Sequence, residues 1–382
     1  MTDGPLLHYV TQPDKLAYAP DAGPTWLRPC GFVRDGGAGA QPCHRLAGGW
    51  AFFTLIDVVI ASDGEGYQAW RTTPEAYHAA SADKDAAEEA LQRLTSPRPD
   101  FAALSLSRPH LMGIVNVTPD SFSDGGVHLA ADDALAGGRL MAEQGASILD
   151  IGGESTRPGA APVPHDEEIR RITPVISQLT DEGMLVSADT RHPQVMQAAL
   201  DAGAPIINDV SGFEAEGAAA LMGAAYHRRP GTVWAVAMHM KGTPQTMQAD
   251  PRYGFAPIEV FEVLKGHVER LEAAGLPRHQ IAIDPGFGFG KTPQHNRQLT
   301  DWTAMFHLLG VPVLVGISRK SSIPRLAAAS ALGAPDDGYG DDASDRLGGT
   351  LALTLEAVRQ GAQLVRTHDI PQTRQAIAIE LG

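Results

Sequence analysis

Side chains able to recognise a small ligand are gathered in short polar segments that directly follow apolar runs. Asp189, Asn208 and Asp284 occupy three such positions, and Lys320 and Arg366 occupy two more. A carboxylate can accept hydrogen bonds from two neighbouring N–H donors of a flat heterocycle, and an amide can both donate and accept. Lysine and arginine supply the cations that phosphate oxygens require. These residue types predict a site for a flat heterocycle beside a phosphate group.

A barrel would bring these segments together. Eight short apolar runs recur along the second part of the chain, separated by helix-length amphipathic stretches such as 132–143 and 257–274. Continuous Val, Ile and Leu runs are typical of parallel strands buried on both faces, with helices as crossovers. Eight strand–helix units favour a closed (β/α)₈ TIM barrel, whose active site lies at the C-terminal ends of the strands. The expected strands are residues 111–117, 147–151, 184–188, 205–210, 233–238, 280–283, 311–317 and 363–365.

A doubly wound open sheet is the alternative fold for such a pattern. That fold binds dinucleotides through a glycine-rich fingerprint early in the sheet, and this chain has none there. Gly286, Gly288 and Gly290 have the spacing G-x-G-x-G. We therefore do not interpret them as a nucleotide-binding loop.

The first part of the chain has a different pattern. Glycine and proline are frequent there, and the clear elements are an apolar run at 51–61 and a helical pattern at 79–94, which Ser81 could cap. Residues 95–109 contain three prolines and predict a linker. We expect an N-terminal α/β extension of unknown role at residues 1–108 and the barrel at residues 109–382.

The amino-acid composition disfavours nucleic acids and membranes as binding partners and so favours small molecules. The net charge of −15 and pI of about 5.3 leave no basic surface for nucleic acid and disfavour anionic membranes. No apolar run reaches the roughly 18 residues of a membrane span, and the start of the chain does not read as a signal peptide, so we expect a cytoplasmic protein. Cys43 beside His44 could be part of a metal site. Because Cys30 is the only other cysteine and a structural zinc site usually has four ligands, we expect both cysteines to be free thiols instead.

Five strings in the chain resemble the dihydropteroate synthase family. They are NVTPDSFSDGG from Asn116, DIGGESTRPGA from Asp150, DPGFGFGK from Asp284, GISRKS from Gly316 and RTHD from Arg366. The resemblance runs in order from 111 to about 369 and is specific because the strings are long. It implies that (7,8-dihydropterin-6-yl)methyl diphosphate condenses with 4-aminobenzoate, giving 7,8-dihydropteroate and diphosphate on the folate pathway.

The resemblance also assigns the pterin site. It implies that Asp284 accepts two pterin N–H donors, that Asp189 and Asn208 bind the remaining ring edge, and that Lys320 donates to ring acceptors. The slot around the ring would be shaped by three apolar or small residues, which are Met238, Phe287 and Gly316.

The diphosphate is expected beside the last strands. Barrels often bind phosphate at the loops after strands seven and eight, and Arg366, His368 and Asn116 fit this role. The i, i+2 spacing of Arg366 and His368 places both on one face of a strand. We expect Mg²⁺ to accompany the diphosphate, with Asn116 as a protein ligand and without a dedicated protein cage.

The second substrate is expected at the first two loops. The resemblance places Asp124 opposite the developing methylene cation. It also implies a 4-aminobenzoate pocket, where sulfonamides should compete, formed by Phe122, Thr156, Arg157, Pro158 and Ser321. The chain shows no nucleophile elbow and no Cys/His catalytic pair. We therefore expect direct attack by the arylamine, with Asp124, Lys320 and Arg366 as catalytic residues that stabilise charge.

Two other functions are compatible with a pterin-binding barrel. A methyltransferase would pass a methyl group from methyltetrahydrofolate to a corrinoid protein, but it has no diphosphate to hold, which the SRKS and RTHD strings argue against. A non-catalytic paralogue would be expected to lose polar strand-end residues, and here they are present. The family is commonly dimeric through its late helices, so the resemblance also implies a homodimer.

Overall fold

The computed structural model describes seven ranges of the chain. They are residues 7–10, 25–34, 42–62, 66–117, 124–155, 162–330 and 342–382, with the backbone alone at 124–129 and 343–344.

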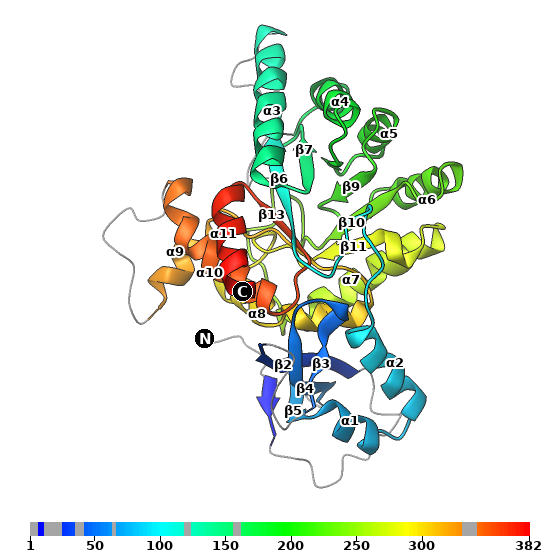
Figure 1. Cartoon of the computed structure of the whole chain (residues 1–382), viewed down its shortest axis with the longest axis vertical. Helices are drawn as coiled ribbons and strands as arrows, with labels where there is room; N and C mark the ends of the chain where they lie inside the picture. Colours follow the sequence, from blue (N-terminus) through cyan, green and yellow to red (C-terminus); the bar gives the residue numbers. More distant parts are fainter. Residues whose placement is uncertain are drawn as a thin grey trace.

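Eight parallel strands form a barrel, as the sequence predicted (Figure 1). In chain order they are β6 (His110–Asn116), β7 (Ile148–Gly152), β8 (Val186–Asp189), β9 (Ile206–Asp209), β10 (Trp234–Met238), β11 (Ile281–Asp284), β12 (Leu314–Val315) and β13 (Leu364–Thr367). Hydrogen-bonded neighbours run β11-β10-β9-β8-β7-β6-β13-β12. A parallel bridge between Ile283 and Val313 joins the two ends of this order, so the sheet closes on itself and the doubly wound alternative is wrong.

Helices cover the outside of the barrel. They are α3 (Asp124–Gln144), α4 (His165–Asp181), α5 (Pro193–Asp201), α6 (Ala218–Arg228), α7 (Ala256–Ala273), α8 (Pro293–Asp301), the 3₁₀ helix η3 (Thr303–Leu309), α9 (Ser322–Ala328), α10 (Leu347–Arg359) and α11 (Ile370–Leu381). The helix predicted at 257–274 is confirmed within one residue. The helix predicted at 132–143 begins earlier, at Asp124, and so takes in part of the segment expected to be the first loop.

The strand sequences explain where polar groups collect. Every residue of β8, β9 and β11 is buried, and the last residue of each strand is an aspartate. Apolar residues before that aspartate are buried against the helices and the barrel interior, while the C-terminal position lies at the open end of the barrel. Asp189, Asp209 and Asp284 therefore reach the same end.

The N-terminal extension is a mixed sheet with two helices. Its strands are β1 (Leu7–Tyr9), β2 (Thr25–Val33), β3 (His44–Arg45), β4 (Phe52–Ala61) and β5 (Tyr67–Thr72), and its helices are α1 (Pro74–Ala80) and α2 (Lys84–Thr95). The neighbours run β1-β5-β4-β2, with β3 also paired to β4. The apolar run at 51–61 is β4, as expected.

The predicted helix at 79–94 is wrong at its start. Two helices occupy this region, and the residue that caps α2 is Asp83, whose carboxylate accepts from the Ala86 N–H at 2.9 Å. Ser81 instead ends α1, and its hydroxyl donates to the Tyr77 carbonyl at 2.8 Å. A serine that bonds back to a carbonyl four residues earlier is satisfied at a helix C-terminus, which is why it does not begin the next helix.

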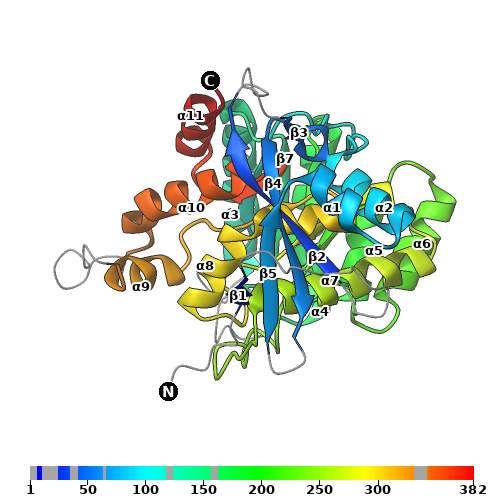
Figure 2. The same ribbon diagram turned by 90° about the horizontal axis from the view of Figure 1, so that it is seen from below.

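The extension packs against the barrel helices and shares one apolar core with them (Figures 1 and 2). Arg28 donates to the Asp301 carbonyl, Trp50 to the Val358 carbonyl and Arg98 to the His307 carbonyl, each at 2.8 Å. Asp301 and Val358 lie in the last turns of α8 and α10. In a β/α barrel these helix ends lie away from the carboxyl ends of the strands, so these contacts leave the ligand-binding end uncovered.

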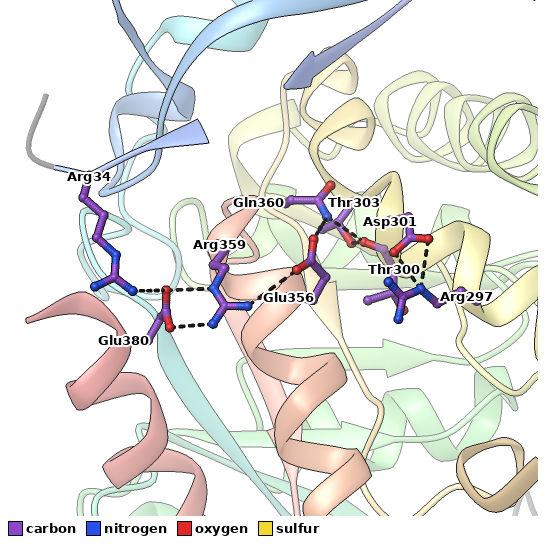
Figure 3. A network of polar contacts seen from close by, with 9 residues as sticks. All are labelled: Arg34, Arg297, Thr300, Asp301, Thr303, Glu356, Arg359, Gln360 and Glu380. Carbon is purple, nitrogen blue, oxygen red and sulfur yellow. Dashed lines mark hydrogen bonds and ion pairs between the residues drawn. The ribbon is translucent and has the colours of Figure 1, made fainter. Parts of the chain in front are cut away.

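A second group of contacts ties α8, α10 and α11 to each other and to the extension (Figure 3). Glu380 of α11 receives hydrogen bonds from Arg359 at 2.7 and 2.8 Å and from Arg34 at 3.2 Å. Gln360, after α10, donates to the Thr300 carbonyl of α8 at 3.0 Å. The late helices are therefore cross-linked through polar side chains as well as packed.

Asp57 is the polar centre of the extension, so we predict that Asp57→Asn destabilises the protein. Its carboxylate is fully buried and accepts from Tyr9 at 2.7 Å, from Arg71 at 2.8 Å and from Arg28 at 3.2 Å. Removing the charge leaves two arginines without their buried anion, so we expect a loss of about 3 kcal/mol in the free energy of unfolding. Denaturant unfolding measures it, with the exposed Asp100→Asn as control. Equal stability of the two variants would contradict the prediction.

Within the described ranges, no helix combines the length and apolar character that a membrane crossing requires.

Candidate active site

Four strand ends meet around the Arg366 guanidinium, which projects from β13. Its Nε donates to Asp150 Oδ2 at 2.6 Å, and its Nη2 donates to Asp189 Oδ2 at 2.7 Å. The Asn208 amide donates to the same Asp150 oxygen at 3.0 Å. Residues from β7, β8, β9 and β13 thus form one hydrogen-bonded cluster at the open end of the barrel.

The charges of this cluster leave acceptor capacity for a ligand. Burial raises the pKa of Asp189 to about 7, against the lowering influence of Arg366. Burial also opposes the charge of Arg366, but Asp150 and Asp189 prevail and hold its pKa above the usual value. Asp150 Oδ1 and Asp189 Oδ1 are buried and have no hydrogen-bond partner among the described residues. Buried acceptors without partners are costly, so N–H donors of a bound ligand would be stabilised there.

A second cluster forms around Asp284 at the end of β11. One carboxylate oxygen accepts from the Gly286 N–H at 2.7 Å. Lys320 donates to the Phe287 carbonyl, and its ammonium lies 4.1 Å from the centre of the Phe289 ring. Burial raises the pKa of Asp284 and lowers that of Lys320 to about 7, while the opposite charge of each partner works against both shifts.

Gly316 links the two clusters. A side-chain Cβ built at this glycine would lie 3.6 Å from Asp284 Oδ2 and 3.8 Å from the Arg366 Cβ. A larger side chain would extend into the space between these groups. The glycine therefore keeps open the gap between the carboxylate of β11 and the guanidinium of β13.

Five more of the predicted residues lie at the same end of the barrel. Met238 is buried and pairs in register with Asp284, and Phe287 is buried in the turn that follows. His368 Nδ1 lies 2.9 Å from the Ser318 hydroxyl, which joins the loops after β12 and β13. Asn116 is exposed at the end of β6, and Ser321 is exposed before α9.

Five predicted residues cannot be placed by their side chains. Phe122, Thr156, Arg157 and Pro158 lie outside the described residues. Asp124 is the first residue of α3, but only its backbone is described. Their assignment to the 4-aminobenzoate side of the site stays a prediction.

Sequence reasoning missed Asp150, which is the most enclosed member of the Arg366 cluster. It is fully buried and bonds both Arg366 and Asn208. The signal was present, because Asp150 begins the DIGGESTRPGA string in β7 just as Asp189 and Asp284 stand in other strands. Lys291 and Ser318 were also missed, and both contact the site through other residues.

Magnesium would have few protein ligands here. No group of three or more His, Cys, Asp or Glu side chains in the described ranges could hold a metal ion. Asn116 offers one exposed amide oxygen, which fits a hard cation that takes most of its oxygens from water and phosphate.

Comparison with known proteins matches the barrel to a single family. The family model for pterin-binding enzymes matches residues 112–368. Dihydropteroate synthase of Escherichia coli K12 is 42% identical over 278 residues, which cover 72% of this chain and 92% of that protein. The chain belongs to the dihydropteroate synthase family.

Solved synthases agree with this placement. A Xanthomonas albilineans dihydropteroate synthase with 4-aminobenzoic acid is 43% identical, with a TM-score of 0.64, over 75% of this chain and 97% of that one. A structure from the same organism in complex with 7,8-dihydropteroate is 38% identical, with a TM-score of 0.61, over 74% and 97%. The family match includes every described site residue, whereas the extension lies before it.

Proposed function

We propose that the chain condenses (7,8-dihydropterin-6-yl)methyl diphosphate with 4-aminobenzoate to give 7,8-dihydropteroate and diphosphate. The observation that carries this proposal is that Arg366, which bonds the buried Asp189, lies across the gap at Gly316 from the buried Asp284 carboxylate. Acceptors of this kind suit the N–H edge of a pterin, and the neighbouring cations suit a diphosphate.

The reaction needs positioning rather than a covalent intermediate. The C–O bond between the pterin methylene and the diphosphate breaks, the arylamine nitrogen forms the new C–N bond, and one amine proton is lost. Asp284, Asp189 and Asn208 would hold the ring edge, and Lys320 would donate to the ring acceptors. Arg366 and His368 would bind the departing diphosphate and stabilise its charge. Asp124 would face the developing methylene cation.

The second substrate would bind at the first two loops. We assign this pocket to residues before α3, after β7 and before α9, namely Phe122, Thr156, Arg157, Pro158 and Ser321. The support is the family resemblance of the strings that contain them, together with the 4-aminobenzoic acid bound by the Xanthomonas synthase.

Mg²⁺ is proposed as a companion of the diphosphate. Asn116 would hold it through its amide oxygen, and the ion would neutralise charge on the leaving group. Asn116 is exposed at the end of β6, and no group of three or more His, Cys, Asp or Glu side chains in the described ranges could hold a metal, which supports an ion that arrives with its phosphate.

We also propose a homodimer in the cytoplasm. The dimer is supported by the family resemblance, although the extension contacts α8, α10 and α11 and so takes part of the surface of the late helices. Light scattering of the full chain tests it. The cytoplasm is supported by Cys30 and Cys43, which are not joined in a disulfide.

The test of the function is diphosphate release by purified protein with the pterin diphosphate and Mg²⁺. Release that requires 4-aminobenzoate, yields dihydropteroate and falls with a sulfonamide would establish the reaction. A protein that binds pterin without releasing diphosphate would point to a methyltransferase or a non-catalytic barrel, and corrinoid-dependent methyl transfer would separate these two.

The pKa of Lys320 predicts a pH dependence. Burial lowers this pKa to about 7, so the ammonium loses its proton as the pH rises through that value. The protonated fraction falls from about one half at pH 7 to about 3% at pH 8.5. The ammonium is a charged donor to the pterin substrate, so kcat/KM for the pterin diphosphate should fall by about tenfold over this range. Lys320→Arg, which keeps its charge, should lose this decline whatever its absolute rate. An unchanged profile in the variant would assign the decline to another group.

A further inference from the structure

Lys291, at the end of the turn after β11, is a buried lysine that the proposed reaction does not use. Its exposed fraction is 2%. The ammonium nitrogen lies 2.8 Å from His239 Nδ1 and 2.9 Å from both the Gly286 and Phe289 carbonyl oxygens. Two of these three close contacts are carbonyl oxygens, which accept from the lysine, and none of the three is a carboxylate. Burial lowers the pKa of Lys291, which shows that burying its ammonium is unfavourable. A buried lysine that costs stability calls for a functional explanation, and its hydrogen bonds suggest one.

Side chains, rather than a regular element, fix the shape of the turn at 286–290. All five of its carbonyls accept a hydrogen bond from a side chain. Lys291 donates to Gly286 and Phe289, Lys320 to Phe287, Gln248 to Gly288 at 2.7 Å and Tyr253 to Gly290 at 2.9 Å. Lys291 therefore supplies two of the five side-chain hydrogen bonds to the carbonyls of the turn, and it does so from inside the protein.

The inner side of the turn carries two groups of the site. The Gly286 N–H donates to Asp284, and the Phe287 carbonyl accepts from Lys320. Gly286 has a φ of +70°, and a Cβ there would lie 1.9 Å from the His239 carbonyl oxygen. The turn is thus pressed against the end of β10 at the residue whose ring also contacts Lys291. A shift of the Gly286 or Phe289 carbonyl would move the partners of both Asp284 and Lys320.

We propose that Lys291 is a positioning residue for pterin binding, which anchors the 286–290 turn so that Gly286 orients Asp284 and Phe287 orients Lys320. The inference rests on the proposed function, because it takes Asp284 and Lys320 as the groups that bind the pterin. Lys291 itself does not contact the substrate. Its effect should be confined to the pterin side of the reaction.

The test is steady-state kinetics of Lys291→Met, which keeps an unbranched side chain one atom shorter and removes its donors. The KM for the pterin diphosphate should rise by about tenfold, because two hydrogen bonds to the turn are lost, while the KM for 4-aminobenzoate changes by less than about twofold. Tyr253→Phe is the matched control. It removes the bond to Gly290 at the outer end of the turn, which touches neither Asp284 nor Lys320, and should leave both KM values near those of the unmodified protein.

Loss of folding is separated from loss of positioning by a second variant. Lys291→Gln keeps one donor group and should fold where the methionine variant does not, with an intermediate rise in the pterin KM. An unmodified protein that turns over, together with a folded Lys291 variant whose pterin KM is unchanged or whose two KM values rise equally, would overturn the proposal. An unmodified protein without turnover would instead overturn the proposed function.

Discussion

Asp284→Asn is expected to weaken binding of the pterin diphosphate by at least about hundredfold, since two charge-assisted hydrogen bonds contribute about 3 kcal/mol or more. The carboxylate is 5% exposed, and one of its oxygens is already occupied by the Gly286 N–H. If the asparagine carbonyl keeps that bond, its NH₂ group must face the pterin donors. A donor would then oppose a donor, which costs more than the simple absence of an acceptor.

Calorimetry with the pterin diphosphate and the folded variant measures this loss. The matched control is Asp209→Asn, another buried aspartate at a strand end. Its carboxylate accepts from Ser211 N, Ser211 Oγ and Phe213 N, each at 2.7 Å, so its bonds lie within its own loop. The control should lose stability and retain pterin affinity. Equal affinity of the Asp284 and Asp209 variants would remove Asp284 from the pterin site.

The barrel could be predicted because its strands are buried on both faces. Runs such as that of β6, in which six of seven residues are buried, leave a continuous apolar signal in the sequence. Polar residues at the end of each run then indicate the end of the barrel where the site lies. Asp189, Asn208, Asp284 and Arg366 follow this pattern, and the structure brings them to one end.

The extension was harder to predict because its strands break local rules. β2 contains Pro29 and Gly31, and both residues are uncommon within strands. The structure accommodates them because β2 is at the edge of the sheet and Gly31 has a φ of +63°, a conformation that costs glycine little. Tertiary packing on the barrel, rather than local propensity, stabilises this strand.

The contacts within the site were beyond sequence reasoning for a different reason. Arg366 and Asp150 are 216 residues apart, and their ion pair depends on how the barrel closes. The sequence indicates at which end of the barrel each residue lies, but not which residue of another strand it will bond. Arg366 was therefore predicted to bind the diphosphate and stabilise charge, whereas in the structure it also holds two buried carboxylates.

This double role shapes what Arg366→Ala is expected to do. Binding of the pterin diphosphate should fall by about hundredfold or more, because a charge-assisted contact to phosphate and the orientation of Asp189 are both lost. Binding of the corresponding pterin alcohol should fall by only about fivefold to tenfold, since it loses the orientation of Asp189 but no anion contact. Calorimetry with both ligands measures the difference. Equal losses would show that Arg366 orders the carboxylates without binding the anion.

The same substitution should make stability depend on pH. Without the guanidinium, Asp150 and Asp189 remain buried side by side, so the pKa of Asp189, already about 7, should rise further. A carboxyl group whose pKa is higher in the folded state takes up a proton on folding. The Arg366→Ala protein should therefore be least destabilised at low pH and lose stability as the pH rises. Unfolding of Arg366→Ala should therefore cost about 3 kcal/mol less than that of the unmodified protein near pH 8 and recover part of this loss near pH 6. Arg366→Lys, which keeps a cation near both carboxylates, should show a smaller loss and a weaker pH dependence. A loss of stability that is independent of pH in both variants would mean that Arg366 does not stabilise the ionised carboxylates of Asp150 and Asp189.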